Sequence, residues 1–156
     1  MKRAQAMVET LIAVLVIMLI FTTAFTLSRK LAARTLLDYG AARAARAKAV
    51  GFNDFMCRKS ARAAIIPVAG KRLWPMKPGV DEVSLVPIYL ASENPPRANA
   101  ILEYEYWHTT DVDVQSGMGT APVVEARVEM STRDFTVEGN AQVESHFPFY
   151  MYDAGF

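Results

Sequence analysis

Residues 10–28 of the chain have the sequence TLIAVLVIMLIFTTAFTLS, and none of these nineteen residues carries a charge. As an α-helix, which rises about 1.5 Å per residue, the run would be roughly 28 Å long. That length is close to the hydrocarbon thickness of a bilayer, about 30 Å. The run therefore predicts a membrane-spanning helix, and the residues beside it indicate which kind.

Glu9 stands immediately before this run, at the boundary where a carboxylate becomes costly. A charged side chain costs up to about 3 kcal/mol toward the bilayer centre. The small residue Ala4 precedes Gln5 and follows the basic pair Lys2 and Arg3. If the chain is cut between Ala4 and Gln5, the freed amine of a neighbouring copy can compensate the charge of Glu9. Such a pairing is typical of a subunit that is stored in a membrane and then moved into a filament.

Two other interpretations of the N-terminal segment stay open. A secretory signal peptide would have residues 11–21 as its apolar region and would be cut after Ala24. Against it, Glu9 abuts the apolar core, and apolar residues continue beyond Ala24. A plain transmembrane anchor also fits the run, and basic residues on both sides leave its orientation open. Neither interpretation accounts for Glu9.

Residues 4–9, AQAMVE, followed by a long apolar helix, resemble the start of TadE-like pseudopilins. Members of that family show a small residue, then Gln-Ala, two apolar residues and Glu before the membrane helix. The basic, alanine-rich stretch 29–51 and the alternating strands that end near residues 146–150 are similar to the family in character. Two positions depart from the pattern: Ala4 stands where Gly is usual, and Thr10 where an aromatic residue often follows the Glu.

The resemblance implies a structural role without enzymatic activity or a cofactor. A prepilin peptidase would cut the bond between Ala4 and Gln5, and Glu9 would be the assembly residue. The chain would be a minor pilin-like subunit of a type IV or tight-adherence pilus, serving adhesion, or of a related secretion apparatus. Its partners would be other pilin-like subunits, an inner-membrane assembly platform and the lipid bilayer. It would cross the bacterial inner membrane once, with its globular part outside the cytoplasm, or lie in an extracellular filament.

Composition and motifs exclude several other classes of function. Seventeen Lys and Arg against sixteen Asp and Glu give a net charge of +1, so no electrostatic case for nucleic acid arises. Cys57 is the only cysteine, which excludes an intramolecular disulfide and leaves open a packed thiol or an intermolecular bridge. His108, Asp111 and Asp113, which we place in a loop, lack metal-ligand spacing. We expect no catalytic or metal site.

We expect four segments: a leader at 1–4, a transmembrane segment at 5–28, a helical extension with a short second helix at 29–66, and a β-rich part at 67–156. Strong helix formers at 29–50 predict that the membrane helix continues to a cap at Gly51. One face of this extension is predicted to meet the globular part, namely Leu27, Leu31, Leu36, Tyr39 and Ala42. Its basic side chains predict contact with lipid head groups or an acidic partner, or else a solvated face: Arg29, Lys30, Arg34, Arg43 and Arg46.

The remaining pattern predicts a short helix and several strands. Asn53 is expected to cap a helix at 54–64 that Pro67 closes, and residues 67–99 to form an irregular connection with one strand at 82–86. Alternating apolar residues predict strands at 101–107 and 122–130, and the composition predicts strands at 135–137 and 141–147 around a turn at 138–140. We therefore expect an α+β, pilin-like fold, in which the long helix covers a small antiparallel sheet. The aromatic tract 147–152 would be either core or a contact surface for a partner subunit.

Overall fold

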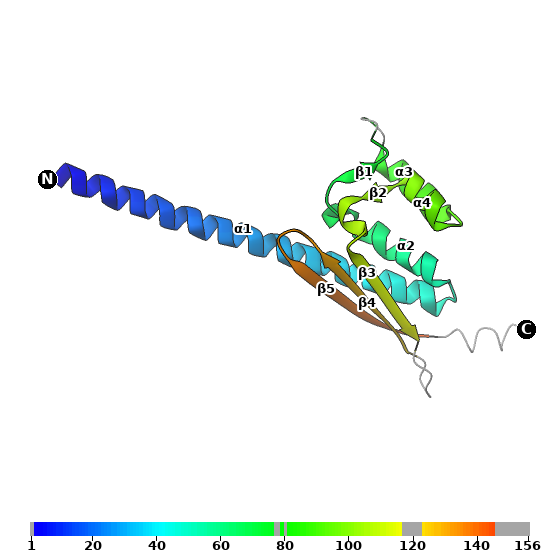
Figure 1. Cartoon of the computed structure of the whole chain (residues 1–156). Coiled ribbons are helices and arrows are strands. Elements are labelled where there is room, and N and C mark those ends of the chain that lie inside the picture. The colour runs from blue at the N-terminus through cyan, green and yellow to red at the C-terminus, as the bar shows by residue number, and fades with distance from the viewer. Residues whose placement is uncertain (1, 77–78, 80, 117–122, 146–156) are drawn as a thin grey trace, which may run out of the picture. The chain divides into compact units, whose positions relative to one another are not determined.

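The computed structural model describes residues 2–76, 79, 81–116 and 123–145, with side chains from Met7 onward. The chain divides between Ala32 and Ala33 into two compact units. Helix α1, Lys2–Ala49, begins in the first unit, and its residues from Ala33 onward belong to the second (Figure 1).

The first unit is an uninterrupted helix with its side chains exposed. Its threonines bond back to the helix: Thr22 Oγ1 donates to Met18 O at 3.0 Å and Thr23 Oγ1 to Leu19 O at 2.7 Å. Such bonds satisfy hydroxyls that would otherwise be unpaired in lipid. By length and composition, the described part of α1, Met7–Ala49, is a candidate membrane span.

The second unit is α+β, and the predicted fold class is confirmed. The C-terminal part of α1 packs on a small antiparallel sheet, in the arrangement expected of a pilin-like chain. After α1 the elements are α2 (Asp54–Ala64), the 3₁₀ turn η1 (Ile66–Val68), β1 (Arg72–Trp74), α3 (Glu82–Ala91), α4 (Pro95–Ile101), β2 (Glu103–Tyr104), the 3₁₀ turn η2 (Glu105–Trp107), β3 (Thr110–Ser116), β4 (Val123–Ser131) and β5 (Thr136–Glu144).

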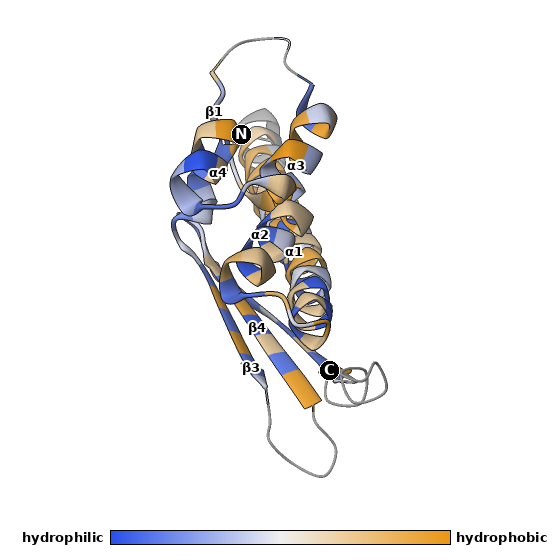
Figure 2. Cartoon of the chain, turned by 90° about the vertical axis from the view of Figure 1, so that its right-hand side faces the viewer, coloured by the Kyte–Doolittle hydropathy of each residue, from blue (hydrophilic) through white to orange (hydrophobic). Residues whose placement is uncertain are grey.

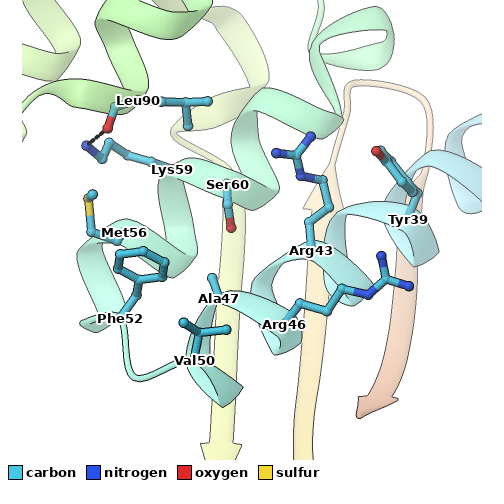
Figure 3. Close-up of a pocket in the computed structure, with 10 residues that line it drawn as sticks. All are labelled: Tyr39, Arg43, Arg46, Ala47, Val50, Phe52, Met56, Lys59, Ser60 and Leu90. Atoms are coloured by element: carbon cyan, nitrogen blue, oxygen red, sulfur yellow. Dashed lines mark hydrogen bonds between the residues drawn. The ribbon is translucent and has the colours of Figure 1, made fainter.

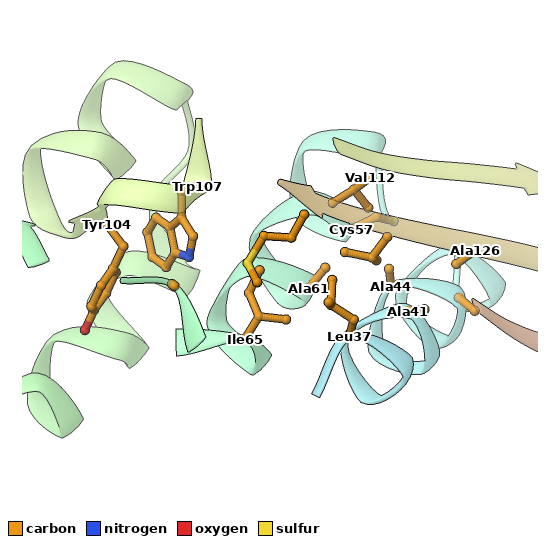
Figure 4. Close-up of a cluster of buried hydrophobic side chains, with 14 of the residues drawn as sticks. Leu37, Ala41, Ala44, Cys57, Ala61, Ile65, Tyr104, Trp107, Val112 and Ala126 are labelled. Atoms are coloured by element: carbon orange, nitrogen blue, oxygen red, sulfur yellow. The ribbon is translucent and has the colours of Figure 1, made fainter. Parts of the chain in front are cut away.

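The main sheet has the order β3-β4-β5, with antiparallel pairs throughout. The strand predicted at 122–130 is confirmed from Val123 onward, since its even-numbered residues are buried and its odd-numbered charged residues are exposed. A second, two-stranded sheet pairs β1 with β2. The core lies between the main sheet and the helices and is lined on α1 by small residues (Figure 4).

The face of α1 that meets the core differs from the predicted one. Leu27, Leu31 and Tyr39 are exposed, and Leu36 and Ala42 are only partly buried. Packing instead uses a stripe of residues at spacings of four, four and three: Ala33, Leu37, Ala41 and Ala44. The three alanines of this stripe allow the sheet and α2 to approach the helix axis, and Leu37 is its one large buried side chain.

The ends of α1 and α2 are as predicted. Gly51, at φ 96°, donates to Lys48 O at 2.9 Å, and Phe52 N donates to Ala47 O at 3.0 Å. These two bonds are the Schellman arrangement that ends a helix at glycine. Asn53 caps α2 by accepting from Met56 N at 2.9 Å, so the two helices are joined by a short, fully bonded turn.

The turn predicted at 138–140 is wrong, because these residues lie inside the continuous strand β5. Gly139 is buried there, and a Cβ on it would overlap backbone atoms of Leu37 and Asp38 in α1. Asp38 Oδ1 also accepts from Asn140 N at 3.1 Å. The glycine therefore serves the close approach of helix and strand, and not a turn.

Residues 67–101 also depart from the prediction. The strand expected at 82–86 is part of helix α3, and much of the expected irregular connection is helical. Both helices have side-chain caps: Asp81 accepts from Val83 N at 3.1 Å, and Asn94 accepts from Arg97 N at 3.1 Å. Pro87 lies inside α3, a position that usually costs about 3 kcal/mol.

The segment 101–116 differs in the same way. The strand expected at 101–107 shortens to the two residues of β2, followed by the turn η2, which places the Trp107 ring against Tyr89 and Tyr104 with centroids 5.0 and 4.9 Å away. The loop expected around Asp111 is strand β3. The predicted end of the last strand and the aromatic tract 147–152 lie outside the described residues.

Candidate functional site

The site predicted at the N-terminus lies on the first turns of α1. Ala4 and Gln5 are helical, and their side chains lie outside the described part of the structure. Glu9 is exposed, and its neighbour Thr10 donates through Oγ1 to Met7 O at 2.9 Å. Residues four apart share one side of a helix, so position 5 and Glu9 are neighbours along the same face.

The helix of the first unit exposes apolar side chains on every side. Met7 is 73 % exposed and Phe21 is 72 % exposed, and between them no residue of the run is buried. A soluble surface helix has one apolar stripe, whereas a helix that is apolar all round needs lipid or other helices about it. The surface of this unit is therefore suited to lipid or to other helices and not to water.

The five predicted basic residues are all exposed, but they do not form one surface. Arg29 lies in the first unit, with its guanidinium 6.0 Å from the centroid of the Phe25 ring. Lys30 belongs to that unit too, and Arg34, Arg43 and Arg46 belong to the second. Nine residues, about two and a half turns, separate Arg34 from Arg43, which places them on different sides of α1.

Arg43 and Arg46 instead share a groove of about 540 Å³ in the second unit. Its α1 wall is the face opposite the core stripe, with Tyr39, Arg43 and Arg46 at spacings of four and three, and Val50 continues this wall just beyond the end of α1 (Figure 3). The Arg43 guanidinium lies 6.0 Å from the Tyr39 ring centroid. The rest of the lining is mostly apolar and comes from α1, α2 and α3, namely Ala47, Phe52, Met56, Lys59, Ser60 and Leu90. The groove thus has a mostly apolar lining and carries two exposed guanidinium groups, those of Arg43 and Arg46.

Lys59 is the buried charge at the base of this groove, and only 1 % of the residue is exposed. Its Nζ donates to Leu90 O at 2.7 Å and to Ser92 O, at the C-terminal end of α3. The Phe55 ring centroid lies 4.7 Å from the same nitrogen. Burial lowers the pKa of Lys59. A cation suits the carbonyls at a helix C-terminus, so Lys59 ties α2 to the end of α3.

Sequence reasoning missed this role of Lys59. A lysine on a short amphipathic helix predicts a solvated side chain, since lysine is almost never fully buried without a partner. The partners are backbone carbonyls of α3, an element that the sequence did not predict.

The outer face of the main sheet is strongly acidic. Hydrophilic and hydrophobic positions alternate along β3 and β4 (Figure 2). Arg127 is the one cation on this face among the described strand residues; it lies 2.7 Å from Glu138 and 3.7 Å from Glu129. The carboxylates of this face belong to Asp111, Asp113, Glu125, Glu129, Glu138 and Glu144. Only the acids of β4 were predicted to lie on a strand face.

The predicted neighbours His108, Asp111 and Asp113 do not form a joint site. His108 Nε2 lies 2.9 Å from Glu103 Oε1, while both aspartates lie on the outer face of β3. Within the part of the chain that the structure describes, no group of three His, Cys, Asp or Glu side chains could hold a metal ion.

Cys57 is buried in α2, and its Sγ lies 3.7 Å from Phe52 O. Burial raises the pKa of this thiol. The reactive form of a cysteine is the thiolate, so the site of Cys57 disfavours chemistry at the sulfur.

Comparison of the chain with protein-family models, with curated proteins and with solved structures finds no match. Three features of the molecule therefore bear on its function. These are the exposed apolar run of α1 that follows Glu9, the groove that contains Arg43 and Arg46, and the acidic outer face of the sheet.

Proposed function

We propose that the protein is a pilin-like structural subunit of a bacterial type IV or tight-adherence pilus, or of a related secretion apparatus. A prepilin peptidase processes it between Ala4 and Gln5, and it assembles through its N-terminal helix. The observation that carries the proposal concerns α1. Its N-terminal part is apolar on every side, with the exposed Glu9 at the start, while its residues from Ala33 onward are built into a globular core.

The chemistry of Glu9 supplies the assembly step. After cleavage the new amine is four residues from Glu9, about 6 Å along the helix. Helices that pack side by side with an axial stagger bring the amine of one copy to the carboxylate of the next. In a low-dielectric bundle an unpaired carboxylate is heavily penalised, and pairing removes most of that penalty. The pair therefore selects one register between neighbouring helices more than it adds stability.

Before assembly the same helix holds the subunit in the inner membrane. The exposed apolar side chains of residues 7–27 match lipid, and the threonine hydroxyls are bonded within the helix. Arg29 and Lys30 follow the apolar run directly, where long basic side chains extend from the end of a membrane helix into the head-group region. In this account the globular unit lies outside the cytoplasm, and the assembly platform and other pilin-like subunits are the partners.

A second candidate is a secreted or periplasmic binding module that signal peptidase releases after Ala24. The feature that favours it is the position of the apolar helix near the N-terminus, since a signal sequence meets the same criteria of minimum length and apolar composition. The groove of the second unit would then be the ligand site. The two candidates differ in the first residue of the mature chain, which is Gln5 for the pilin-like subunit and Phe25 for the secreted module.

The substitution Glu9→Ala tests the proposal in the full-length chain. We expect the variant to insert into the membrane normally and to be depleted about tenfold or more from the assembled pilus fraction, since one charge pair per contact is lost. Thr10→Ala is the matched control, because it removes a neighbouring exposed polar group and should assemble normally. Normal co-purification of Glu9→Ala with pilus components would contradict the proposal.

A further inference from the structure

We propose that the acidic outer face of the β3-β4-β5 sheet binds the basic groove of a second copy of this chain, forming a head-to-tail contact between globular units. The inference rests on the proposed function and extends it, because it adds an interface outside the N-terminal helix. Charge complementarity between two surfaces of one chain is the observation that carries it.

The acidic side of this contact is arranged in rows across the strands. The pairing register sets Asp111 opposite Glu129, and Glu129 opposite Glu138, so three carboxylates lie in one row. Like charges directly opposite each other destabilise a sheet. Arg127 reaches Glu129 and Glu138 and leaves Asp111 without a basic partner among the described residues. A cation bound beside Asp111 would reduce the repulsion among the three carboxylates of this row.

The outer face also has hollows for such a cation. One, of about 200 Å³, is lined by Asp111, Asp113, Arg127 and Glu129. A second, of about 420 Å³, extends across β3, β4 and β5 and includes Glu125 and Glu138. A guanidinium presents a planar fork that matches carboxylates, which makes arginine the fitting side chain to enter an acidic hollow.

The basic side supplies two arginines from one helix face. Arg43 and Arg46 point away from the core stripe of α1, and Tyr39 and Val50 lie on the same face (Figure 3). The sheet packs against the core side of α1, as the contact between Gly139 and Leu37 shows. The acidic face and the groove therefore lie on opposite sides of the globular unit.

Two complementary surfaces on opposite sides of one unit generate a repeating contact. Such a heterologous interface does not use the same patch on both partners, and it extends into an open assembly unless a rotation closes it. A lipid surface would use the basic groove alone and would leave the acidic face without a role. A second copy uses both faces, and this favours a sister subunit as the occupant.

Cysteine cross-linking in native membranes tests the contact with the full-length chain. The double variant Val50→Cys, Gln115→Cys places one thiol on each surface and keeps every charge of the contact; treated with a short bismaleimide, it should give a ladder of covalent multimers. Each single variant should give no multimers, because neither residue meets its own counterpart. The wild-type chain is the background control, since Cys57 is buried.

A charge reversal added to this double variant tests whether charge complementarity holds the two surfaces together. Arg46→Glu should reduce the ladder about tenfold, since close charge pairs across an interface carry much of its specificity. Arg34→Glu, on another side of α1, should leave the ladder unchanged. Adding Glu129→Lys to the Arg46→Glu chain should restore it.

Three outcomes would overturn the inference. These are the absence of a ladder, dimers from either single cysteine, and adducts to a different protein in place of multimers of this one. The first outcome, with Gln5 as the mature N-terminus and with Glu9-dependent incorporation intact, would refute this contact alone. A mature N-terminus at Phe25 would refute the proposed function instead.

Discussion

Gly139 of β5 lies against the backbone of Leu37 in α1, so closely that a Cβ on residue 139 would overlap the Leu37 carbonyl carbon. The adjacent amide of Asn140 donates to Asp38 Oδ1 at 3.1 Å. Helix and edge strand are thus joined by one close contact and one hydrogen bond, 102 residues apart in the chain. This joint fixes the long helix to the sheet within the globular unit.

Gly139→Ala should therefore destabilise the globular unit by about 2–3 kcal/mol, because an added methyl group forces the strand and helix apart. Urea unfolding of the full chain in detergent, followed by the fluorescence of the buried Trp107, measures this. Asn140→Ala is the control, since it keeps the backbone amide that Asp38 accepts from and should change stability by less than about 0.5 kcal/mol. Equal stability of Gly139→Ala and wild type would contradict the close contact.

Lys59 offers a second test, of the link between α2 and α3. Lys59→Met keeps much of the apolar stem but leaves the carbonyls of Leu90 and Ser92 without their donor. We expect a loss of about 1–3 kcal/mol from these unsatisfied buried acceptors. Arg58→Met, at the exposed neighbouring position, should cost less than about 0.5 kcal/mol in the same unfolding experiment. A Lys59→Met variant as stable as the Arg58→Met variant would show that the contact contributes little.

The buried phenol of Tyr104 should make the globular unit less stable at alkaline pH. Burial, and after it the nearby Glu82 carboxylate, raises the pKa of Tyr104 from 10.0 to about 12. Because folding favours the neutral phenol, its contribution is complete below pH 10 and is lost as the pH rises through about 12. A shift of two pKa units corresponds to about 2–3 kcal/mol.

Tyr104→Phe should remove this part of the alkaline loss. The substitution removes only the buried hydroxyl near the Glu82 carboxylate, so the variant should stay within about 1 kcal/mol of wild type at neutral pH. From below pH 10 to above pH 12 the wild type should lose about 2–3 kcal/mol more than the variant. Parallel alkaline curves for the two proteins would contradict the assigned pKa.

Cys57 provides a prediction about reactivity. Its burial and raised pKa should protect the thiol from a maleimide at neutral pH in native membranes. Complete labelling is expected only after denaturation, which exposes α2. Fast stoichiometric labelling of the native chain would show that α2 opens readily, and a disulfide-linked dimer would show that the sulfur is accessible to a partner.

The sequence predicted the elements whose local pattern agrees with their packing. Strand β4 alternates strictly and has one buried face, and α1 and α2 carry recognisable caps at Gly51 and Asn53. The class of fold follows from these elements, since a long helix and an alternating sheet must bury their apolar faces together. The caps at Asp81 and Asn94 were equally readable and would have indicated α3 and α4.

Other elements depend on contacts that are distant in sequence. Residues 138–140 have the composition of a turn. Gly139 is needed there because the strand lies against the backbone of α1, 102 residues earlier in the chain. The core face of α1 could not be identified from hydrophobicity, because alanine is buried there and the larger Leu31 and Tyr39 are exposed. The groove and the acidic rows likewise arise from tertiary packing and strand register, which a single sequence does not contain.

The first residue of the mature chain tests the central claim most directly. Pairing with Glu9 requires a free amine four residues before it, so intact mass and N-terminal sequencing of the membrane-extracted protein should identify Gln5 as the first residue. The same result is expected for Ala4→Gly. A mature chain that begins at Phe25 would lack Glu9 and most of the apolar helix, and would contradict assembly through that helix.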